Sequence, residues 1–474
     1  MGRVLAALIP VTALVASITT PAAQAADSES TTTTTTAAPV CPPIAATPGV
    51  DPTPPPPPDP TATPDPVTDP ATGPASEPVV TAAAEPAPAE ALEAAEAWDL
   101  STTATPSFGT AKISGKSKSQ KVNAIAEAKG IAYLGGEFTK MTRGSTTKYR
   151  NRLAAVNGKT GELTSWNPNA SGKVYAMELS ADGKSVYVGG DFSSIGGKSA
   201  SKLAKIDLAT GKIDTKFKPS VNGRVRGLAL AGDRLYVGGD FLKVGGKARP
   251  RLAAVNPTTG AVVDWVPPAL GRGRYIGQTG VPTPDYDPGY VYAVEAIGGR
   301  VFAAGNFTNF GCQGGLVTID AGTGGLVEPQ YDPGRPIFDL EAYGGMLYAV
   351  GGGPGGRAYA FSPNDDDPVW RLKVDGDNMG VAVSASTVYV MGHYDYVVSK
   401  DSSCYQFCPG GPRRHHLLAV NRGDGQLLAW NPDANTSTGP YTAFAGQNAL
   451  YVGGEFTEIN FKKQPGFTIF PGTP

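Results

Sequence analysis

The sequence is poor in several features that would mark a common enzyme or a membrane protein. Its 474 residues include four cysteines and three histidines. After residue 26 no apolar run is long enough to cross a bilayer as a helix, so we predict no membrane span. No stretch has the spacing of an amphipathic helix, and no phosphate loop, nucleophile elbow or His-Glu-x-x-His motif is present. These absences exclude the nucleotide-binding and hydrolase classes that such motifs define.

Residues 27–97 have almost no aromatic or large apolar side chains. Thr, Ala, Pro, Asp and Glu dominate, with runs at Thr31–Thr36 and Pro54–Pro58. Such a segment buries too little apolar surface to offset the entropy lost on ordering. We therefore predict a disordered, acidic Pro/Thr/Ala-rich linker over residues 27–97.

The first 26 residues have the layout of a secretory signal peptide. Arg3 is followed by an apolar run, and small residues end in Ala23-Gln24-Ala25. We predict a signal peptide at 1–26 and an exported protein, secreted or associated with the cell wall.

Charge is unevenly distributed along the chain. The net charge is −2, yet residues 1–97 contain one base and eleven acids, so the remainder carries +8. A mildly basic domain outside the cell favours an anionic partner other than nucleic acid.

Four short phrases recur about every fifty residues from position 122 onward. Each is β-branched or aromatic and is bounded by Gly, Pro, Asn or Asp, which is typical of strands and turns. The first phrase is apolar, as in Val122–Ala126, Val174–Leu179, Val225–Leu230, Val291–Ala296 and Ile337–Ala342. The second phrase begins at Tyr133, Tyr187, Tyr236, Phe302, Tyr348, Tyr389 and Tyr451. The third reads Leu-Ala-Ala-Val-Asn or similar, and the fourth ends near Trp166, Phe217, Trp265, Tyr331, Trp370 or Trp430.

Repeats of four strands at this spacing predict a propeller. We predict an all-β domain at 98–474, a seven-bladed β-propeller of four-stranded antiparallel blades, with six or eight blades as alternatives. The last repeat stops after its third phrase, so we expect Thr105–Ile113 to complete that blade and close the ring. The Gly-Gly pair in the second phrase indicates a close approach of neighbouring sheets. The tryptophans are interpreted as wedges between blades.

The motifs Tyr-Val-Gly-Gly-Asp-Phe, Arg-Leu-Ala-Ala-Val-Asn-Pro-Thr-Thr-Gly and Ser-Trp-Asn-Pro resemble those of the delta-60 repeat β-propellers of secreted bacterial proteins. The resemblance covers residues 105–474 and implies the fold and export. It supplies no catalytic motif.

An acid follows the Gly-Gly pair in the four strongest repeats. These residues are Glu137, Asp191, Asp240 and Glu455. A ring of carboxylates could bind Ca²⁺, whereas a structural role would have each acid accept backbone N–H groups at a turn. We favour the structural role and predict no cofactor, with Ca²⁺ as the exception to test.

Histidine and cysteine gather in the sixth repeat. His393, His415 and His416 lie there. A copper site with Tyr394, Tyr396 and Cys404 is one hypothesis, and a surface or binding loop is the interpretation we favour. Cys404 and Cys408 are predicted to form a disulfide, and Cys41 and Cys312 have no assigned partner.

The long connections all belong to one end of the predicted propeller. They are Lys140–Asn151, Val266–Gly289 and Asp395–Arg414. Long loops on a rigid scaffold are where function collects, and Arg with Tyr suits anionic or sugar ligands. The predicted ligand-binding residues are Arg272, Arg274, Tyr275, Tyr286, Tyr396, Arg413, Arg414 and His415. We therefore expect a non-catalytic binding or scaffold module whose partner is an extracellular glycan, an anionic polymer or another protein. A secreted carbohydrate-active enzyme or a metal or quinone oxidoreductase is the alternative.

Overall fold

The computed structural model describes the chain from residue 99 onward, with internal gaps. The described residues are 99–110, 120–270, 273–276, 282–287, 289–307, 314–331, 333–353, 355–398, 411–435 and 439–473. They fall within one unit, Val40–Pro474. The predicted signal peptide and linker and all four cysteines lie outside them, and so does the predicted Cys404–Cys408 disulfide.

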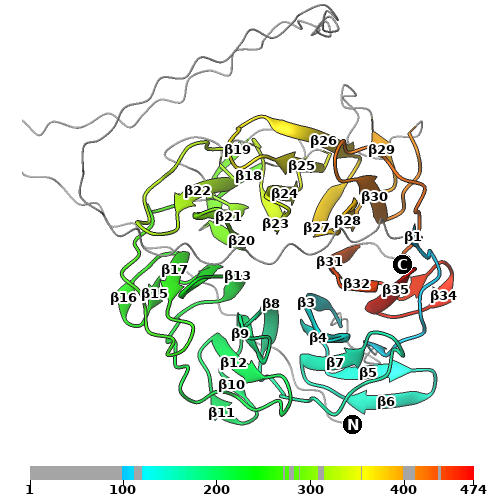
Figure 1. Cartoon of the computed structure of the whole chain (residues 1–474), viewed down its shortest axis with the longest axis horizontal. Coiled ribbons are helices and arrows are strands. Elements are labelled where there is room, and N and C mark those ends of the chain that lie inside the picture. The colour runs from blue at the N-terminus through cyan, green and yellow to red at the C-terminus, as the bar shows by residue number, and fades with distance from the viewer. Residues whose placement is uncertain are drawn as a thin grey trace, which may run out of the picture. The chain divides into compact units, whose positions relative to one another are not determined.

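The described part of the chain is all β and is built as a β-propeller (Figure 1). It contains no helix that could span a membrane. The repeats predicted from the sequence form antiparallel sheets, which we number one to seven in chain order. In each sheet the first strand lies innermost, the second pairs with it, and the third pairs with the second.

The innermost strands surround a common centre, and each contacts the innermost strand of the next sheet (Figure 1). Strand β31 of sheet seven also contacts β3 of sheet one. The innermost strands are β3 (Val122–Ala128), β8 (Lys173–Leu179), β13 (Val225–Ala231), β20 (Tyr290–Ile297), β23 (Ile337–Tyr343), β27 (Asp377–Val383) and β31 (Pro440–Ala445). The sequence phrases did not identify the last two of these strands.

The second and third strands match the predicted phrases closely. The second strands are β4 (Ile131–Gly136), β9 (Ser185–Asp191), β14 (Arg234–Gly239), β21 (Arg300–Asn306), β24 (Met346–Gly351), β28 (Thr387–His393) and β32 (Ala449–Gly454). The third strands are β7 (Leu153–Asn157), β12 (Leu203–Asp207), β17 (Leu252–Val255), β22 (Leu316–Asp320), β25 (Arg357–Phe361), β30 (Leu417–Asn421) and β35 (Phe467–Thr473).

The fourth phrase departs from the predicted strand in most sheets. In sheets one, two, three, four and six it touches the third strand through a single bridge, such as Val156 to Leu163. Asn and Pro in Trp-Asn-Pro weaken a regular ladder, because Pro has no N–H to donate. Only in sheet five, among the described residues, does the phrase form a full strand, β26 (Pro368–Val374), which also pairs with β29 (Val397–Val398).

The N-terminal segment pairs with the last strand of the chain. Strand β1 (Asp99–Leu100) pairs with β35 at Thr473 and Gly472, and Thr105 bridges to Ile469. The observed pairing segment therefore lies further toward the N-terminus than the predicted Thr105–Ile113, and shares Thr105 with it. Its later part, β2 (Gly109–Thr110), instead joins a hairpin of sheet one, formed by β5 (Lys140–Arg143) and β6 (Thr146–Tyr149).

Shorter hairpins follow the second strand in other sheets. They are β10 (Ser194–Ile195) with β11 (Lys198–Ser199), β15 (Lys243–Val244) with β16 (Lys247–Ala248), and β33 (Glu458–Ile459) with β34 (Lys462–Lys463). A further hairpin, β18 (Gly273–Ile276) with β19 (Pro282–Asp287), lies in the predicted loop Val266–Gly289.

The Gly-Gly pair confirms the predicted close approach of neighbouring sheets. A Cβ on Gly135 would lie 2.4 Å from Cγ1 of Val174 in the next sheet, and a Cβ on Gly453 would lie 2.6 Å from Cγ1 of Val122. The first glycine therefore leaves room for a valine in the first two residues of the neighbouring innermost strand.

The aromatic residue of the fourth phrase lies between sheets, as predicted. Trp265 is fully buried, packs edge-on against Tyr236 at 5.1 Å between ring centroids, and donates its indole N–H to the Asp320 carbonyl of sheet four at 2.9 Å. Trp166 and Trp370 donate in the same way to Asp207 and Arg422 of the following sheets.

Candidate functional site

Every innermost strand carries a β-bulge at its beginning. The register shifts by one residue between Val122 and Ala124, and equivalent shifts occur in the other six strands. A bulge re-aims the extra side chain and is common beside binding sites. The extra residues, which we call the bulge ring, are Asn123, Tyr175, Arg226, Tyr292, Phe338, Met379 and Tyr441.

The bulge ring lies at the propeller end where the predicted loops emerge. Val122, at the start of β3, pairs with Gly136 at the end of β4, and the hairpin of β5 and β6 follows directly. We call this the channel end.

Arg226 is held among aromatic rings at the channel end. Its guanidinium carbon lies 5.1 Å from the ring centroid of Tyr175, 5.3 Å from that of Tyr290 and 5.7 Å from that of Tyr292. Nη2 lies 3.5 Å from Oδ2 of Asp240. The cation–π contacts and the ion pair together hold the Arg226 side chain in place.

A cavity of about 390 Å³ lies between the innermost strands. All seven of these strands contribute to its lining, which includes four bulge-ring residues, Asn123, Tyr175, Arg226 and Tyr292. Concave sites of roughly this size, with a few converging polar groups, are typical of ligand pockets.

Four acidic side chains line the same cavity, and we call them the carboxyl cluster. They are Glu178, Glu295, Asp339 and Glu341. Burial raises the pKa of Glu178 to about 7, and burial raises the pKa of Asp339 to about 7 although the backbone N–H groups of Val381 and Leu340 oppose the shift. Burial, with the neighbouring Asp339 and Glu178, raises the pKa of Glu341 to about 8. The pKa of Glu295 is raised well above its usual range by burial and then by Glu341.

The repeated acid after Gly-Gly forms ion pairs between sheets. Lys173 Nζ lies 2.7 Å from Oε2 of Glu137, and Lys121 Nζ lies 3.2 Å from Oε2 of Glu455. In both pairs the lysine lies at or just before the innermost strand of the next sheet.

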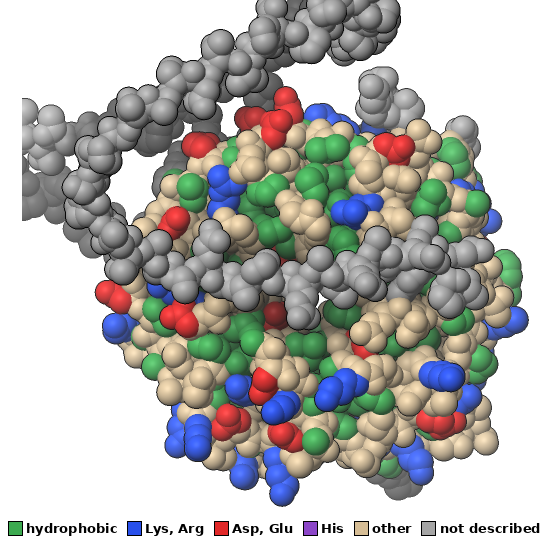
Figure 2. Space-filling view, in the orientation of Figure 1, with side chains coloured by type: hydrophobic (Ala, Val, Ile, Leu, Met, Phe, Trp, Pro, Cys, Tyr) green, Lys and Arg blue, Asp and Glu red, His purple; other side chains and the backbone are tan. Residues whose placement is uncertain are grey.

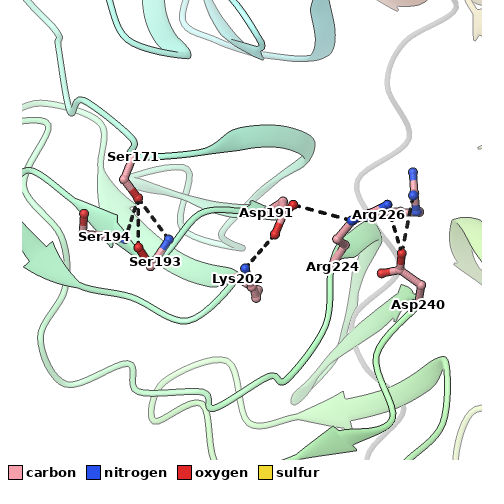
Figure 3. Close-up of polar contacts among 8 residues, drawn as sticks. All are labelled: Ser171, Asp191, Ser193, Ser194, Lys202, Arg224, Arg226 and Asp240. Carbon is pink, nitrogen blue, oxygen red and sulfur yellow. Dashed lines mark hydrogen bonds and ion pairs between the residues drawn. The ribbon is translucent and has the colours of Figure 1, made fainter. Parts of the chain in front are cut away.

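The same belt continues through sheets two and three (Figure 3). Asp191 lies between Lys202, at 2.6 Å, and Arg224, at 3.5 Å, and Arg224 also reaches Asp240 at 3.5 Å. The acids predicted to form a Ca²⁺ ring or to cap turns therefore have cationic partners. In Figure 2 Lys and Arg are most frequent over sheets one to three.

The predicted loop-face residues are only partly described. Arg272 lies outside the described residues, and Arg274, Tyr275 and Tyr286 fall in β18 and β19, whose side chains are also outside them. The sheet-six members lie together: Tyr396 bridges to Arg413 through the backbone. Arg414 donates to the carbonyls of Arg413 and Leu428, and burial lowers its pKa.

His415 lies between two acids. Its Nδ1 contacts Oδ1 of Asp433, and its Nε2 lies 3.2 Å from Oδ1 of Asp395. The ring centroid of His416 lies 4.1 Å from that of His415 and 6.0 Å from that of His393. The sequence prediction gathered these histidines but did not include Asp395 or Asp433.

Sequence reasoning also missed the carboxyl cluster. Glu178, Glu295 and Glu341 occupy the same place in their strands, four residues after Val174, Val291 and Ile337. Aligning the first phrases residue by residue would have revealed them.

The match of one segment to a family model supports the β-propeller fold. Residues 181–217 match a family model described as "Domain of unknown function (DUF5122) beta-propeller". No curated protein matches the sequence. A crystal structure of the computationally designed Ika8 protein is similar over 77% of this chain and 99% of that chain, at 12% identity and a TM-score of 0.42.

Proposed function

We propose that the domain is a seven-bladed, closed propeller of the delta-60 repeat type. The contact of each innermost strand with the next, including β31 with β3, supports this count. Pairing of β1 with β35 would supply the missing outer strand of the last blade and close the ring.

We further propose that the protein is an exported, non-catalytic binding module for an extracellular glycan or another anionic polymer. The ligand would contact the channel end, where the bulge ring lies and where Asn123, Tyr175, Arg226 and Tyr292 of that ring line the cavity. The observation that carries this proposal is Arg226 fixed among Tyr175, Tyr290 and Tyr292 beside the cavity. Aromatic faces suit sugar rings, and a guanidinium suits a carboxylate or sulfate group.

The carboxyl cluster supports binding better than glycoside cleavage. Cleavage needs one ionised carboxylate opposite a protonated one. Here burial raises the pKa of all four groups, so at mildly acidic pH they are protonated and can donate hydrogen bonds to hydroxyl or ether oxygens.

Binding to an acidic polysaccharide, polygalacturonate, and to neutral dextran tests this proposal. We expect salt-sensitive binding to polygalacturonate. Arg226→Gln and Tyr292→Ala should each weaken it about tenfold, which corresponds to ~1.4 kcal/mol.

The matched control is Arg234→Gln, which removes the same charge from the opposite end of sheet three. Arg234 donates to the Ala321 and Gly322 carbonyls there. Equal weakening by Arg234→Gln, or unchanged binding by Arg226→Gln, would contradict the proposed site. A well-folded protein that binds neither polymer nor any glycan on an array would contradict the function.

A further inference from the structure

Sheet six differs from sheet one at one set of equivalent polar positions. Arg152 and His416 both directly precede the third strand and share a positive φ, of 64° and 71°. Counting from these two residues, from the glycine that ends the second phrase (Gly136 and Gly392) and from the Trp-Asn-Pro phrase gives the other matches. The sheet-one residues Glu137, Thr139, Asn151, Arg152 and Asn169 correspond to His393, Asp395, His415, His416 and Asp433 in sheet six.

The equivalent side chains occupy the same geometry with different chemistry. In sheet one, Asn151 Nδ2 donates to Oδ1 of Asn169 at 2.8 Å. In sheet six, His415 Nδ1 contacts Oδ1 of Asp433 at the matching place. Sheet one therefore shows what this corner of a blade requires structurally, and a neutral amide pair satisfies it. The ionisable histidine and aspartate side chains of sheet six are therefore not needed for this structural role.

The donor atoms of Asp395, His415 and His416 converge. One carboxylate oxygen and one ring nitrogen from each histidine all lie within 4.8 Å of one another. Oδ1 of Asp395 is 3.2 Å from Nε2 of His415. Two ligands of a tetrahedral Zn²⁺ ion at ~2.0–2.2 Å lie about 3.3 Å apart, so this pair already has the separation that a shared metal ion needs.

Asp433 orients His415 from the opposite side of the ring. A carboxylate on Nδ1 fixes the tautomer that leaves the Nε2 lone pair for a metal, and metal-binding histidines commonly have such a partner. Asp395 is partly buried and follows β28, whereas His415 and His416 precede β30. The group therefore joins two rigid, adjacent strands.

We propose that Asp395, His415 and His416 bind one first-row divalent cation, with Zn²⁺ the best match, and that Asp433 is the positioning residue for His415. Two imidazoles with one carboxylate are a donor set of zinc and non-haem metal sites. Three protein ligands leave at least one position for water or for an oxygen of a bound ligand. The site lies at the channel end, but its existence does not depend on the glycan proposal.

Metal titration of the untagged full chain, first stripped with a chelator, tests the proposal. We expect one equivalent of Zn²⁺ to bind with a Kd below about 10 µM. Co²⁺ bound in its place should give visible absorption bands that report its coordination. His415→Ala and Asp395→Asn should each weaken binding at least tenfold, and Asp433→Asn about 10–100-fold.

Three controls separate this site from other metal binding. Asn151→Ala changes the equivalent position of sheet one, His393→Ala removes the exposed third histidine, and a Cys404→Ser/Cys408→Ser double variant removes the two cysteines that lie between Asp395 and His415 in the sequence. Each should keep the affinity of the parent protein within about threefold. Folding of each variant is checked by its Tm.

The absence of a one-to-one metal complex would overturn the proposal. So would loss of binding in the cysteine variant with retention in His415→Ala and Asp395→Asn.

Discussion

Side chains in the interior of the sheets are similar from one repeat to another, whereas side chains at the channel end differ, as sheets one and six illustrate. In the interior the two sheets are alike: Tyr133 meets Trp166 at 5.1 Å and Tyr389 meets Trp430 at 5.4 Å, both edge-on. At the channel end they share the backbone path but not the side chains.

The difference has a packing cause. Interior residues wedge one sheet against the next, so their shape is constrained in every repeat. Side chains at the channel end need only a hydrogen-bonded or ion-paired partner, which several residue types can provide. Changes in the interior should therefore affect stability, and changes at the channel end should mainly affect binding.

The largest effect should come from removing the N-terminal segment. A chain that begins at Gln120 lacks β1 and the buried Leu100 and Phe108. We expect it to lose more than about 5 kcal/mol of stability or to aggregate, because the apolar surface that Leu100 and Phe108 cover and the edge of β35 become exposed. Urea unfolding and light scattering measure this, with a chain beginning at Trp98 as the control. Equal stability of the two chains would argue against closure by this segment.

A single interior wedge should have the next largest effect. Trp265→Ala leaves a cavity beside Tyr236 and removes the indole bond to Asp320, so we expect a loss of about 3–5 kcal/mol. Leu242→Ala is the control, because Leu242 is 57% exposed and should cost less than ~0.5 kcal/mol. Similar losses in both variants would contradict the wedge role.

The carboxyl cluster should make stability depend on pH. The folded-state pKa values, about 7 for Glu178 and about 8 for Glu341, exceed the ordinary value of 4.5, so the folded protein retains protons that the unfolded chain releases. Stability is therefore fully present below pH ~4.5 for these groups and declines as pH rises through 7–8. The fall should be on the order of 1–3 kcal/mol, limited because the cavity admits solvent.

Glu178→Gln/Glu341→Gln should flatten this decline between pH 5 and pH 9, as measured by urea unfolding. The exposed Asp233→Asn is the control and should leave the slope unchanged. A parent protein whose stability rises over this range would show that the cluster is ionised in the folded state.

The smallest effect should come from the ion pairs between sheets. Glu137→Gln removes the partner of Lys173, which is half exposed, so we expect a loss of about 0.2–1 kcal/mol that disappears in high salt. A double-mutant cycle with Lys173→Met gives the pair energy. A coupling above ~2 kcal/mol would place this pair among the interior contacts rather than the channel-end ones.

The sequence by itself determined the repeat length and the fold class that this repeat implies. Period, strand phrases and turn residues predicted an all-β propeller, and the Gly-Gly pair predicted close sheet contact. These features are local or strictly periodic, so they can be read along the chain. The fourth phrase was the exception. Its aromatic residue lies between sheets as predicted, but Pro and Asn prevent the regular strand that was also predicted.

Only the tertiary structure decided which polar residues meet. Glu178 and Glu341 are far apart in sequence, and ring geometry brings both to one cavity. Asp395 follows β28, His415 precedes β30 and Asp433 follows the fourth phrase, and only the folded sheet brings these three segments together. A strand period tells which face a side chain takes, but the neighbour across a ring of sheets depends on the order and curvature of all the sheets together.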